Sequence, residues 1–237
     1  MKPPVNIVCV KTGDKYTSQD VARLYRMVER NCTLPFCFYC LTDNVYDLPN
    51  NVIGVEVDHS LDLEGVWWKI CLFNLGWEDP ILYIDLDVVI QNNVDYMFKD
   101  NDNKLKLLRV LDNGGKYLHD GDPNNPLTIP PVYVNTSLMK FVPKNYQQIF
   151  NKFIEDPDYN IIHFFGLDRF ITHYFQDQCS YWKFTKDYYW RAKASEKYDP
   201  QYISNMHPGW ITDPNPTFCI VTNSTPDMYI ELEKYFL

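Results

Sequence analysis

The stretch ILYIDLDVVI, residues 81–90, decides the fold and raises the question of function. Eight of its ten residues are apolar, which predicts a strand buried in a sheet. Asp85 and Asp87 interrupt this run, although moving even one unpaired carboxylate out of water costs several kcal/mol. Either the pair emerges at a sheet edge that faces solvent, or a cation lies between the two carboxylates.

The spacing of the pair favours the cation. Residues i and i+2 of a strand point to the same face, about 6.6 Å apart along the chain, so Asp85 and Asp87 should project together. Two such carboxylates can reach one Mg²⁺ or Mn²⁺, which prefer oxygen ligands and leave positions open for substrate phosphates. A D-x-D triplet is also common in solvated loops, but this copy lies between apolar runs. The sequence therefore predicts a metal site formed by these two residues.

Strand and helix signals alternate through the first ninety residues. Strands are expected at residues 5–12, 35–43, 52–58 and 80–90, and helices at 18–31 and 63–76. Ser18 is the expected N-cap of the first helix. This alternation predicts an α/β fold with a mostly parallel sheet and helices on both faces, and ligands bind such sheets beyond the carboxyl ends of the strands.

The second half of the chain has a more mixed pattern. Strands are expected at 104–112, 132–141, within 181–190 and at 218–223, helices at 145–156 and 166–175, and an irregular loop at 113–131. The sequence has no internal repeat and no long linker. It therefore predicts a single α/β domain over residues 1–237.

Composition narrows the class of partner. The chain has 237 residues, of which 46% are hydrophobic and 16% aromatic, enough for a large packed core. A net charge of −9 argues against a nucleic-acid partner, because phosphate backbones require a basic face. The beginning, MKPPVNIVCV, has no signal-peptide pattern and no apolar run is long enough to span a bilayer. We expect a cytoplasmic protein, encoded by a bacterium or a virus, without a membrane span.

Four blocks of the sequence, taken together, resemble a known family. GVWWKICLFNLGWEDPILYIDLDVVI, residues 65–90, resembles the region around the D-x-D motif of GT-A glycosyltransferases, especially the glycogenin-like group and its small bacterial and viral relatives. Residues 5–16, 132–141 and 166–175 resemble other blocks of that family in matching order. The resemblance implies a GT-A fold, with a nucleotide-sugar-binding half at about 1–100 and an acceptor-binding half at about 101–237.

The resemblance also implies roles for the donor site. Asp85 and Asp87 would hold Mn²⁺ (or Mg²⁺) against the diphosphate of a nucleotide-sugar, with Asp85 also near the ribose. The nucleobase and ribose would be met by Val10, Lys11 and Tyr16.

Three further residues receive roles near the transferred sugar. Lys69 would reach the phosphate or sugar and assist the leaving group, and otherwise it is a solvated helix lysine. Asn135 would line the sugar pocket, and otherwise it only ends a strand. Asp168 would bind donor hydroxyls or lie beside the anomeric carbon, and otherwise it is an acid at a helix start. Lys69 and Asp168 are therefore the candidate catalytic residues.

The chain departs from the family pattern at two places. The family's third metal ligand is a C-terminal histidine, and the matching segment here, CIVTNSTPDM, has none. Asn223 or His207 could replace it. At the second place, Arg169 stands where the family has glutamine, and it could meet a phosphate or pair with an acid.

A group of aromatic residues late in the chain could stack on an acceptor sugar or simply fill the core. It comprises Trp182, Tyr188, Tyr189, Trp190 and Trp210.

These observations predict a metal-dependent transferase that moves a sugar from a nucleoside-diphosphate sugar, a UDP-sugar by resemblance, to a glycan or other hydroxyl acceptor. Retention of anomeric configuration is expected, and an inverting enzyme would use Asp168 as its base. One alternative is a haloacid-dehalogenase-like phosphohydrolase with Asp85 as nucleophile and Asp87 as acid/base on Mg²⁺. Another is a non-catalytic module that binds a nucleotide or sugar. The sequence identifies neither the sugar nor the acceptor, and does not settle the oligomeric state.

Overall fold

The structure is a computed structural model, and it describes residues 3–99, 102, 104–109, 132–183, 188–191 and 217–221. For residues 188–191 and 219–221 it describes the backbone alone. Of the residues considered above, Trp210, His207 and Asn223 lie outside these ranges, as does the expected loop at 113–131.

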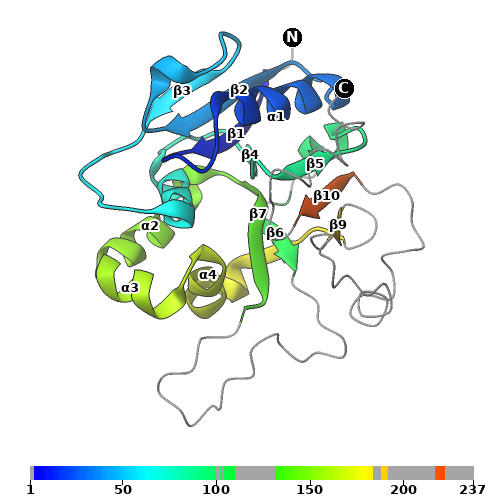
Figure 1. Cartoon of the computed structure of the whole chain (residues 1–237). Coiled ribbons are helices and arrows are strands. Elements are labelled where there is room, and N and C mark those ends of the chain that lie inside the picture. Colours follow the sequence, from blue (N-terminus) through cyan, green and yellow to red (C-terminus); the bar gives the residue numbers. More distant parts are fainter. Residues whose placement is uncertain are drawn as a thin grey trace, which may run out of the picture.

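A seven-stranded sheet forms the centre of the molecule, with the strand order β3-β2-β1-β4-β7-β6-β8 (Figure 1). Its strands are β1 (Val5–Lys11), β2 (Phe36–Thr42), β3 (Ile53–Glu56), β4 (Ile81–Ile84), β6 (Leu105–Arg109), β7 (Val134–Phe141) and β8 (Cys179–Tyr181). Only β7 runs against its two neighbours, and the other neighbouring pairs are parallel. The predicted α/β fold with a mostly parallel sheet is confirmed.

Helices cover both faces of this sheet, because successive residues of the central strands point to opposite sides. Ile7 and Cys9 of β1 join the core beneath α1 (Ser18–Asn31), whereas Val8 joins a second core. Figure 1 shows α1 on one side of the sheet and the longer helices that follow it in the chain on the opposite side. These are η2 (Gly65–Asn74), α2 (Gln147–Ile154), α3 (Pro157–Phe164) and α4 (Leu167–Phe175). Short 3₁₀ turns complete the fold: η1 (Val45–Asp47), η3 (Asp95–Phe98), η4 (Pro143–Tyr146) and η5 (Gln176–Gln178).

Two helix predictions need correction. The N-cap of α1 is Thr17, and Ser18 is the first helical residue. The Thr17 backbone N–H donates to the Asp20 carboxylate at 2.8 Å, so the acid three positions on selects the start of the helix. The α3 helix was not expected at all; it has Pro157 at its first position and Asp156 as its N-cap.

The helix expected at 63–76 is η2, a 3₁₀ helix from Gly65 to Asn74. Five of its side chains are buried on more than one side, so it lacks the single apolar stripe of a surface α-helix. Runs of 3₁₀ helix this long are uncommon, and here tertiary packing holds the segment.

The single strand expected at 80–90 is wrong. β4 ends at Ile84, and β5 (Val88–Ile90) belongs to a second, three-stranded sheet with β9 (Tyr188–Arg191) and β10 (Phe218–Val221). Between them the Val88 N–H donates to the Asp85 carbonyl at 3.1 Å, which closes a turn. Asp85 and Asp87 are therefore turn residues, and this placement keeps two carboxylates out of the interior of a sheet.

The strand signal at 181–190 is likewise divided, between β8 and β9, which lie in different sheets. Trp182 is buried, so it fills the core, which was the alternative to a role in stacking on an acceptor sugar.

Within the described part of the chain, no helix combines the length and the apolar character needed to cross a membrane. The division into a nucleotide half and an acceptor half stays a prediction.

Candidate active site

A cleft of about 170 Å³ lies beyond the carboxyl ends of β1 and β4, where α/β sheets bind ligands. Three segments supply its lining: the end of β1 with the loop that follows it, the start of η2, and the turn after β4. Five of the eight residues predicted for the site line this cleft, namely Val10, Tyr16, Lys69, Asp85 and Asp87.

Asp85 is held by two donors from regular structure. The Lys69 ammonium lies 2.7 Å from Asp85 Oδ2, and the Tyr83 hydroxyl donates to Oδ1. The side chains of Lys69 and Asp85 are only 13% and 16% exposed. Tyr83 was not predicted as a site residue, although it belongs to β4 and precedes Asp85 by only two positions.

Lys69 stays charged in this position. Burial alone would lower its pKa, but the carboxylates of Asp85, Asp168 and Asp87 outweigh burial, and the pKa of Lys69 is raised above its usual value. Lys69 is therefore a cation within an acidic cluster and not the solvated helix lysine that the sequence also allowed.

Asp87 is held from the other direction, by the loop after β1. The Tyr16 hydroxyl donates to Asp87 Oδ2 at 2.9 Å. Lys15 also lines the cleft, and its ammonium lies 4.6 Å from the centre of the Tyr16 ring. Lys15 was not predicted, because nothing in the sequence distinguishes it from any other exposed lysine.

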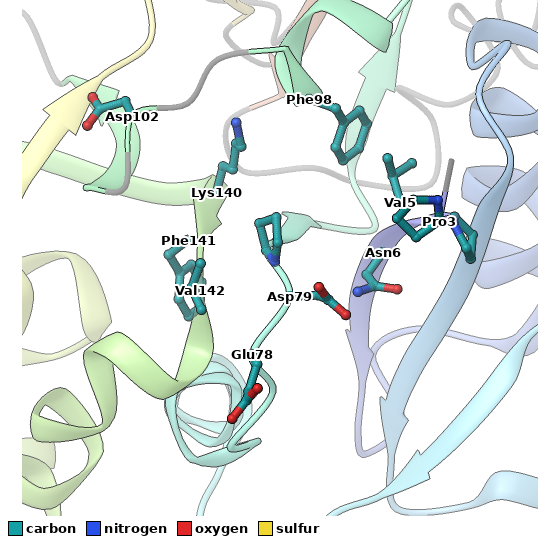
Figure 2. A pocket seen from close by; sticks show the side chains of 12 residues that line it. Pro3, Val5, Asn6, Glu78, Asp79, Phe98, Asp102, Lys140, Phe141 and Val142 are labelled. Carbon is teal, nitrogen blue, oxygen red and sulfur yellow. The ribbon is translucent and has the colours of Figure 1, made fainter. Parts of the chain in front are cut away.

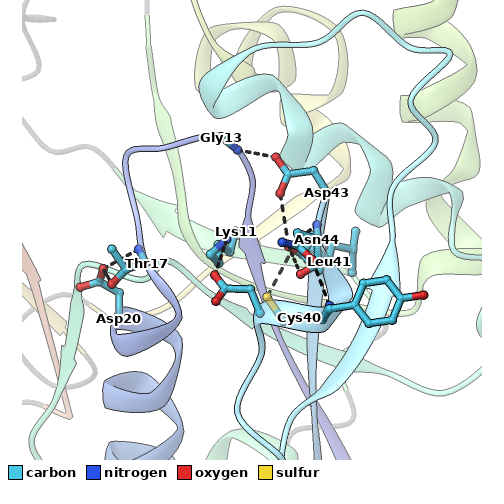
Figure 3. Close-up of polar contacts among 11 residues, drawn as sticks. Lys11, Gly13, Thr17, Asp20, Cys40, Leu41, Asp43 and Asn44 are labelled. Atoms are coloured by element: carbon cyan, nitrogen blue, oxygen red, sulfur yellow. Dashed lines mark hydrogen bonds and ion pairs between the residues drawn. The ribbon is translucent and has the colours of Figure 1, made fainter.

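Figure 3 shows how this loop is attached to the sheet. The Gly13 N–H donates to Asp43 Oδ2 at 2.6 Å, which ties the loop to the end of β2. Gly13 has φ +61°, a conformation that glycine adopts without strain. Lys11 is buried, and its ammonium lies 3.7 Å from Asp47. Lys11 is not part of the cleft lining, because it points to the opposite face of β1 from Val10. Its predicted contact with a nucleobase or ribose stays a prediction.

Asn135 and Asp168 contact each other beside the cleft rather than in its lining. Asp168 Oδ2 accepts from Asn135 Nδ2 at 3.1 Å, and Oδ1 accepts from the backbone N–H and hydroxyl of Thr136 at 2.9 and 2.5 Å. Burial raises the pKa of Asp168, although the Lys69 charge and the Thr136 bonds lower it in part. Thr136 is a further residue that the sequence did not single out.

Comparison with known proteins identifies the fold. The galactosyltransferase LgtC, solved in complex with donor and acceptor sugar analogs, superposes with a TM-score of 0.60 at 12% identity, covering 98% of this chain and 94% of LgtC. The glycosyltransferase GlyE of Streptococcus pneumoniae TIGR4 superposes with a TM-score of 0.64 at 13% identity, covering 98% of this chain and 61% of GlyE. This chain has the GT-A fold.

The bifunctional glycosyltransferase WbbM also has this fold; it superposes with a TM-score of 0.63 at 10% identity, and the match covers all of this chain and 50% of WbbM. No family model and no curated protein sequence matches the chain. At these identities the likeness establishes the GT-A fold, and the chemistry has to be argued from the cleft.

The two cleft carboxylates fit a divalent cation that binds together with a phosphorylated ligand. Within residues 3–99, 102, 104–109 and 132–183, no group of three His, Cys, Asp or Glu side chains is arranged to hold a metal by itself. Mg²⁺ sites, however, are commonly built from one or two carboxylates and completed by substrate phosphates and water. Asp85 and Asp87 line one cleft and supply that set. The third-ligand candidates, His207 and Asn223, lie outside the described residues.

A larger cavity, of about 360 Å³, lies at the opposite end of the GT-A sheet (Figure 2). It is lined by the residues that precede β1 and β4 and by the end of β7. Its one lining lysine, Lys140, is buried and donates to the Met97 carbonyl at 2.7 Å. The smaller cleft is the better candidate for the active site, because it lies at the carboxyl ends of the strands and contains the paired carboxylates, and the greater size of the other cavity does not offset these two features.

Proposed function

We propose that this protein is a metal-dependent glycosyltransferase that transfers a sugar from a nucleoside-diphosphate sugar, a UDP-sugar in the first instance, to a saccharide or other hydroxyl acceptor. The observation that carries the proposal is the position of Asp85, Asp87 and Lys69 in one cleft at the carboxyl edge of a GT-A sheet. Carboxylates and an ammonium together suit a ligand that arrives with a divalent cation and leaves as a diphosphate.

The donor would lie across the turn after β4. Val10 and Tyr16 line the cleft on the β1 side and are the candidates for contact with the base and ribose. Lys11 lies next to Val10 in the chain and forms an ion pair with Asp47. Mn²⁺ (or Mg²⁺) would be held by Asp85 and Asp87, and when bound it would supply positive charge to the diphosphate.

Lys69 would assist departure of the leaving group. Its raised pKa keeps the ammonium charged, and its bond to Asp85 fixes its position before the donor binds. A fixed positive charge placed where negative charge develops lowers the barrier without reorganisation during the reaction.

Asp168 would act on the sugar side. Its carboxylate is oriented by Asn135 and Thr136, and it is close enough to Lys69 for their charges to affect one another. In a retaining reaction it would bind donor hydroxyls, and in an inverting one it would take the acceptor proton, a role that its raised pKa suits.

The phosphohydrolase alternative is not favoured, because the three solved structures compared above are glycosyltransferases. The non-catalytic alternative makes a different prediction, ligand binding without turnover. A binding experiment followed by a turnover assay separates the three.

The test is calorimetric titration of UDP, GDP and dTDP, with and without Mn²⁺, into the unmodified protein and Asp87→Ala. The matched control is Asp158→Ala, which removes an exposed carboxylate from α3. We expect one nucleotide to bind in a metal-dependent way to the unmodified protein and to the control, and not to Asp87→Ala.

Turnover is then assayed with the sugars of that nucleotide. Transfer, or slow hydrolysis of the donor, supports the enzyme, whereas binding without either reaction makes the protein a binding module. If none of the three nucleotides binds with or without Mn²⁺, the glycosyltransferase proposal fails.

A further inference from the structure

Two lysines line the cleft, and their surroundings differ. Lys69 is largely buried and paired with Asp85 at 2.7 Å, so part of its charge is offset by a carboxylate of the protein. Lys15 is exposed, and its ammonium lies over the Tyr16 ring, 4.6 Å from the centre. A cation–π contact at an exposed site is weak, so this ammonium can move from the ring to a stronger partner.

The position of Lys15 is linked to the candidate metal ligands. Tyr16, on which its ammonium lies, donates its hydroxyl to Asp87 at 2.9 Å. The loop that carries both residues is tied to the end of β2 through Gly13 and Asp43. Lys15 therefore belongs to the loop that contacts Asp87, whereas Lys69 belongs to η2 and contacts Asp85.

The charges of the cleft indicate what Lys15 binds. The lining carries two carboxylates and two ammonium groups, and one ammonium is paired inside the protein. With one divalent cation and the Lys69 ammonium present, the donor diphosphate and the two carboxylates still leave excess negative charge in the cleft, and the excess is larger for the released nucleoside diphosphate. A second cation that is not yet paired, and that can reach a phosphate without a large desolvation cost, completes the neutralisation.

We propose that Lys15 binds the diphosphate of the donor from the loop after β1, while Lys69 approaches the same diphosphate from η2. This inference rests on the proposed function and names a residue that neither the family resemblance nor the sequence pattern assigned. It predicts that Lys15 recognises phosphate and not the nucleoside.

The experiment compares UDP with uridine as titrants, in the presence of Mn²⁺, using the unmodified protein, Lys15→Gln and Lys15→Arg. If GDP or dTDP binds more tightly than UDP, that nucleotide and its nucleoside are used as titrants in place of UDP and uridine. The matched control is Lys152→Gln, because Lys152 also lies over a tyrosine ring, Tyr174 at 5.1 Å, but belongs to α2 and pairs with Glu155.

We expect Lys15→Gln to reduce the affinity for UDP about 10-fold, which corresponds to the loss of one charge-assisted hydrogen bond. The affinity for uridine should not change. Lys15→Arg should retain most of the affinity, and Lys152→Gln should retain all of it. The thermal midpoint should not move in Lys15→Gln, since the side chain is exposed.

Three results would overturn the proposal, and they differ from one another. UDP affinity within about twofold of the unmodified protein in Lys15→Gln removes the phosphate role and leaves the proposed function standing. Equal weakening of UDP and uridine assigns Lys15 to the shape of the loop. Absence of any nucleotide binding to the unmodified protein rejects the proposed function and this inference together.

Discussion

Asp85 and Asp87 lie two positions apart in one turn, yet their surroundings differ. Asp85 is largely buried and accepts from Lys69 and Tyr83, which belong to η2 and β4. Asp87 accepts from Tyr16, which belongs to a loop. Regular elements place side chains more rigidly than loops do, so the first carboxylate is preorganised and the second is held by a segment that can adjust to a ligand.

Because of this difference, substitutions near the two carboxylates should have different effects on stability and on ligand binding. On the Asp85 side, removal of a partner leaves a charge or a polar group in a poorly hydrated place. On the Asp87 side, the partner Tyr16 is partly exposed and belongs to a loop, so water can take the place of its hydroxyl more readily. We therefore expect substitutions around Asp85 to reduce the free energy of unfolding and substitutions around Asp87 to reduce ligand affinity more than stability.

The largest effect is expected for Lys69→Met. It leaves the Asp85 carboxylate without its cation, and removing one partner from a buried ion pair typically costs 3–5 kcal/mol. Because both side chains retain some exposure, we expect a loss of about 2 to 3 kcal/mol in the free energy of unfolding, measured by urea denaturation.

A double-mutant cycle tests the physical reason. Asp85→Asn combined with Lys69→Met removes both charges, so the double variant should recover much of the loss. Lys152→Met, a surface control, should change little. If Lys69→Met alone unfolds at the same urea concentration as the unmodified protein, Asp85 is hydrated and the comparison between the two carboxylates breaks down.

A second effect concerns pH, because Lys69 also acts on Asp168. The pKa of Asp168 is raised above its usual value of 3.8, so between these two values the folded protein binds more protons than the unfolded chain. The Asp168 contribution to stability is therefore fully present below the usual pKa and is lost as pH rises through the raised one. Urea midpoints measured from about pH 3 to about pH 8 should show this decline relative to Asp168→Asn.

Carbon-13 NMR of the carboxyl groups supplies the control. Lys69 lowers the pKa of Asp168, so in Lys69→Met the Asp168 titration should move to still higher pH. A titration that moves to lower pH, or does not move, would contradict the assignment of Lys69 as the cation of this cluster.

The same two regions show what the sequence could and could not predict. The alternation of apolar runs and turn residues predicts β1, α1, β2 and β3 closely, since each depends on local periodicity. Asp85 and Asp87 were expected to share one face of a strand, and they lie instead in the turn that follows β4. The break between β4 and β5 was missed, because an apolar run does not reveal whether it crosses from one sheet to another.

The partners of the two carboxylates are harder to predict. Lys69 and Asp85 are 16 residues apart, and Tyr16 and Asp87 are 71 apart, so only the packed fold brings them together. Asp168 was expected near the transferred sugar, and its contacts with Asn135 and Thr136 could not be derived from spacing. Pattern therefore indicates which side chains are chemically suited to a site, and tertiary packing decides which of them pair.

The smallest effect is expected for Tyr16→Phe, and Tyr83→Phe is its matched partner. Each substitution removes one phenol hydroxyl that donates to a carboxylate of the same turn. Tyr83 is fully buried, so its loss should cost about 1 to 2 kcal/mol of unfolding free energy, whereas Tyr16 is partly exposed and should cost about 0.5 kcal/mol or less. In UDP titrations with Mn²⁺ the order should reverse, because the Tyr16 hydroxyl positions Asp87. If Tyr83→Phe weakens UDP more than Tyr16→Phe does, the preorganised carboxylate dominates binding, and the loop side of the cleft has the lesser role.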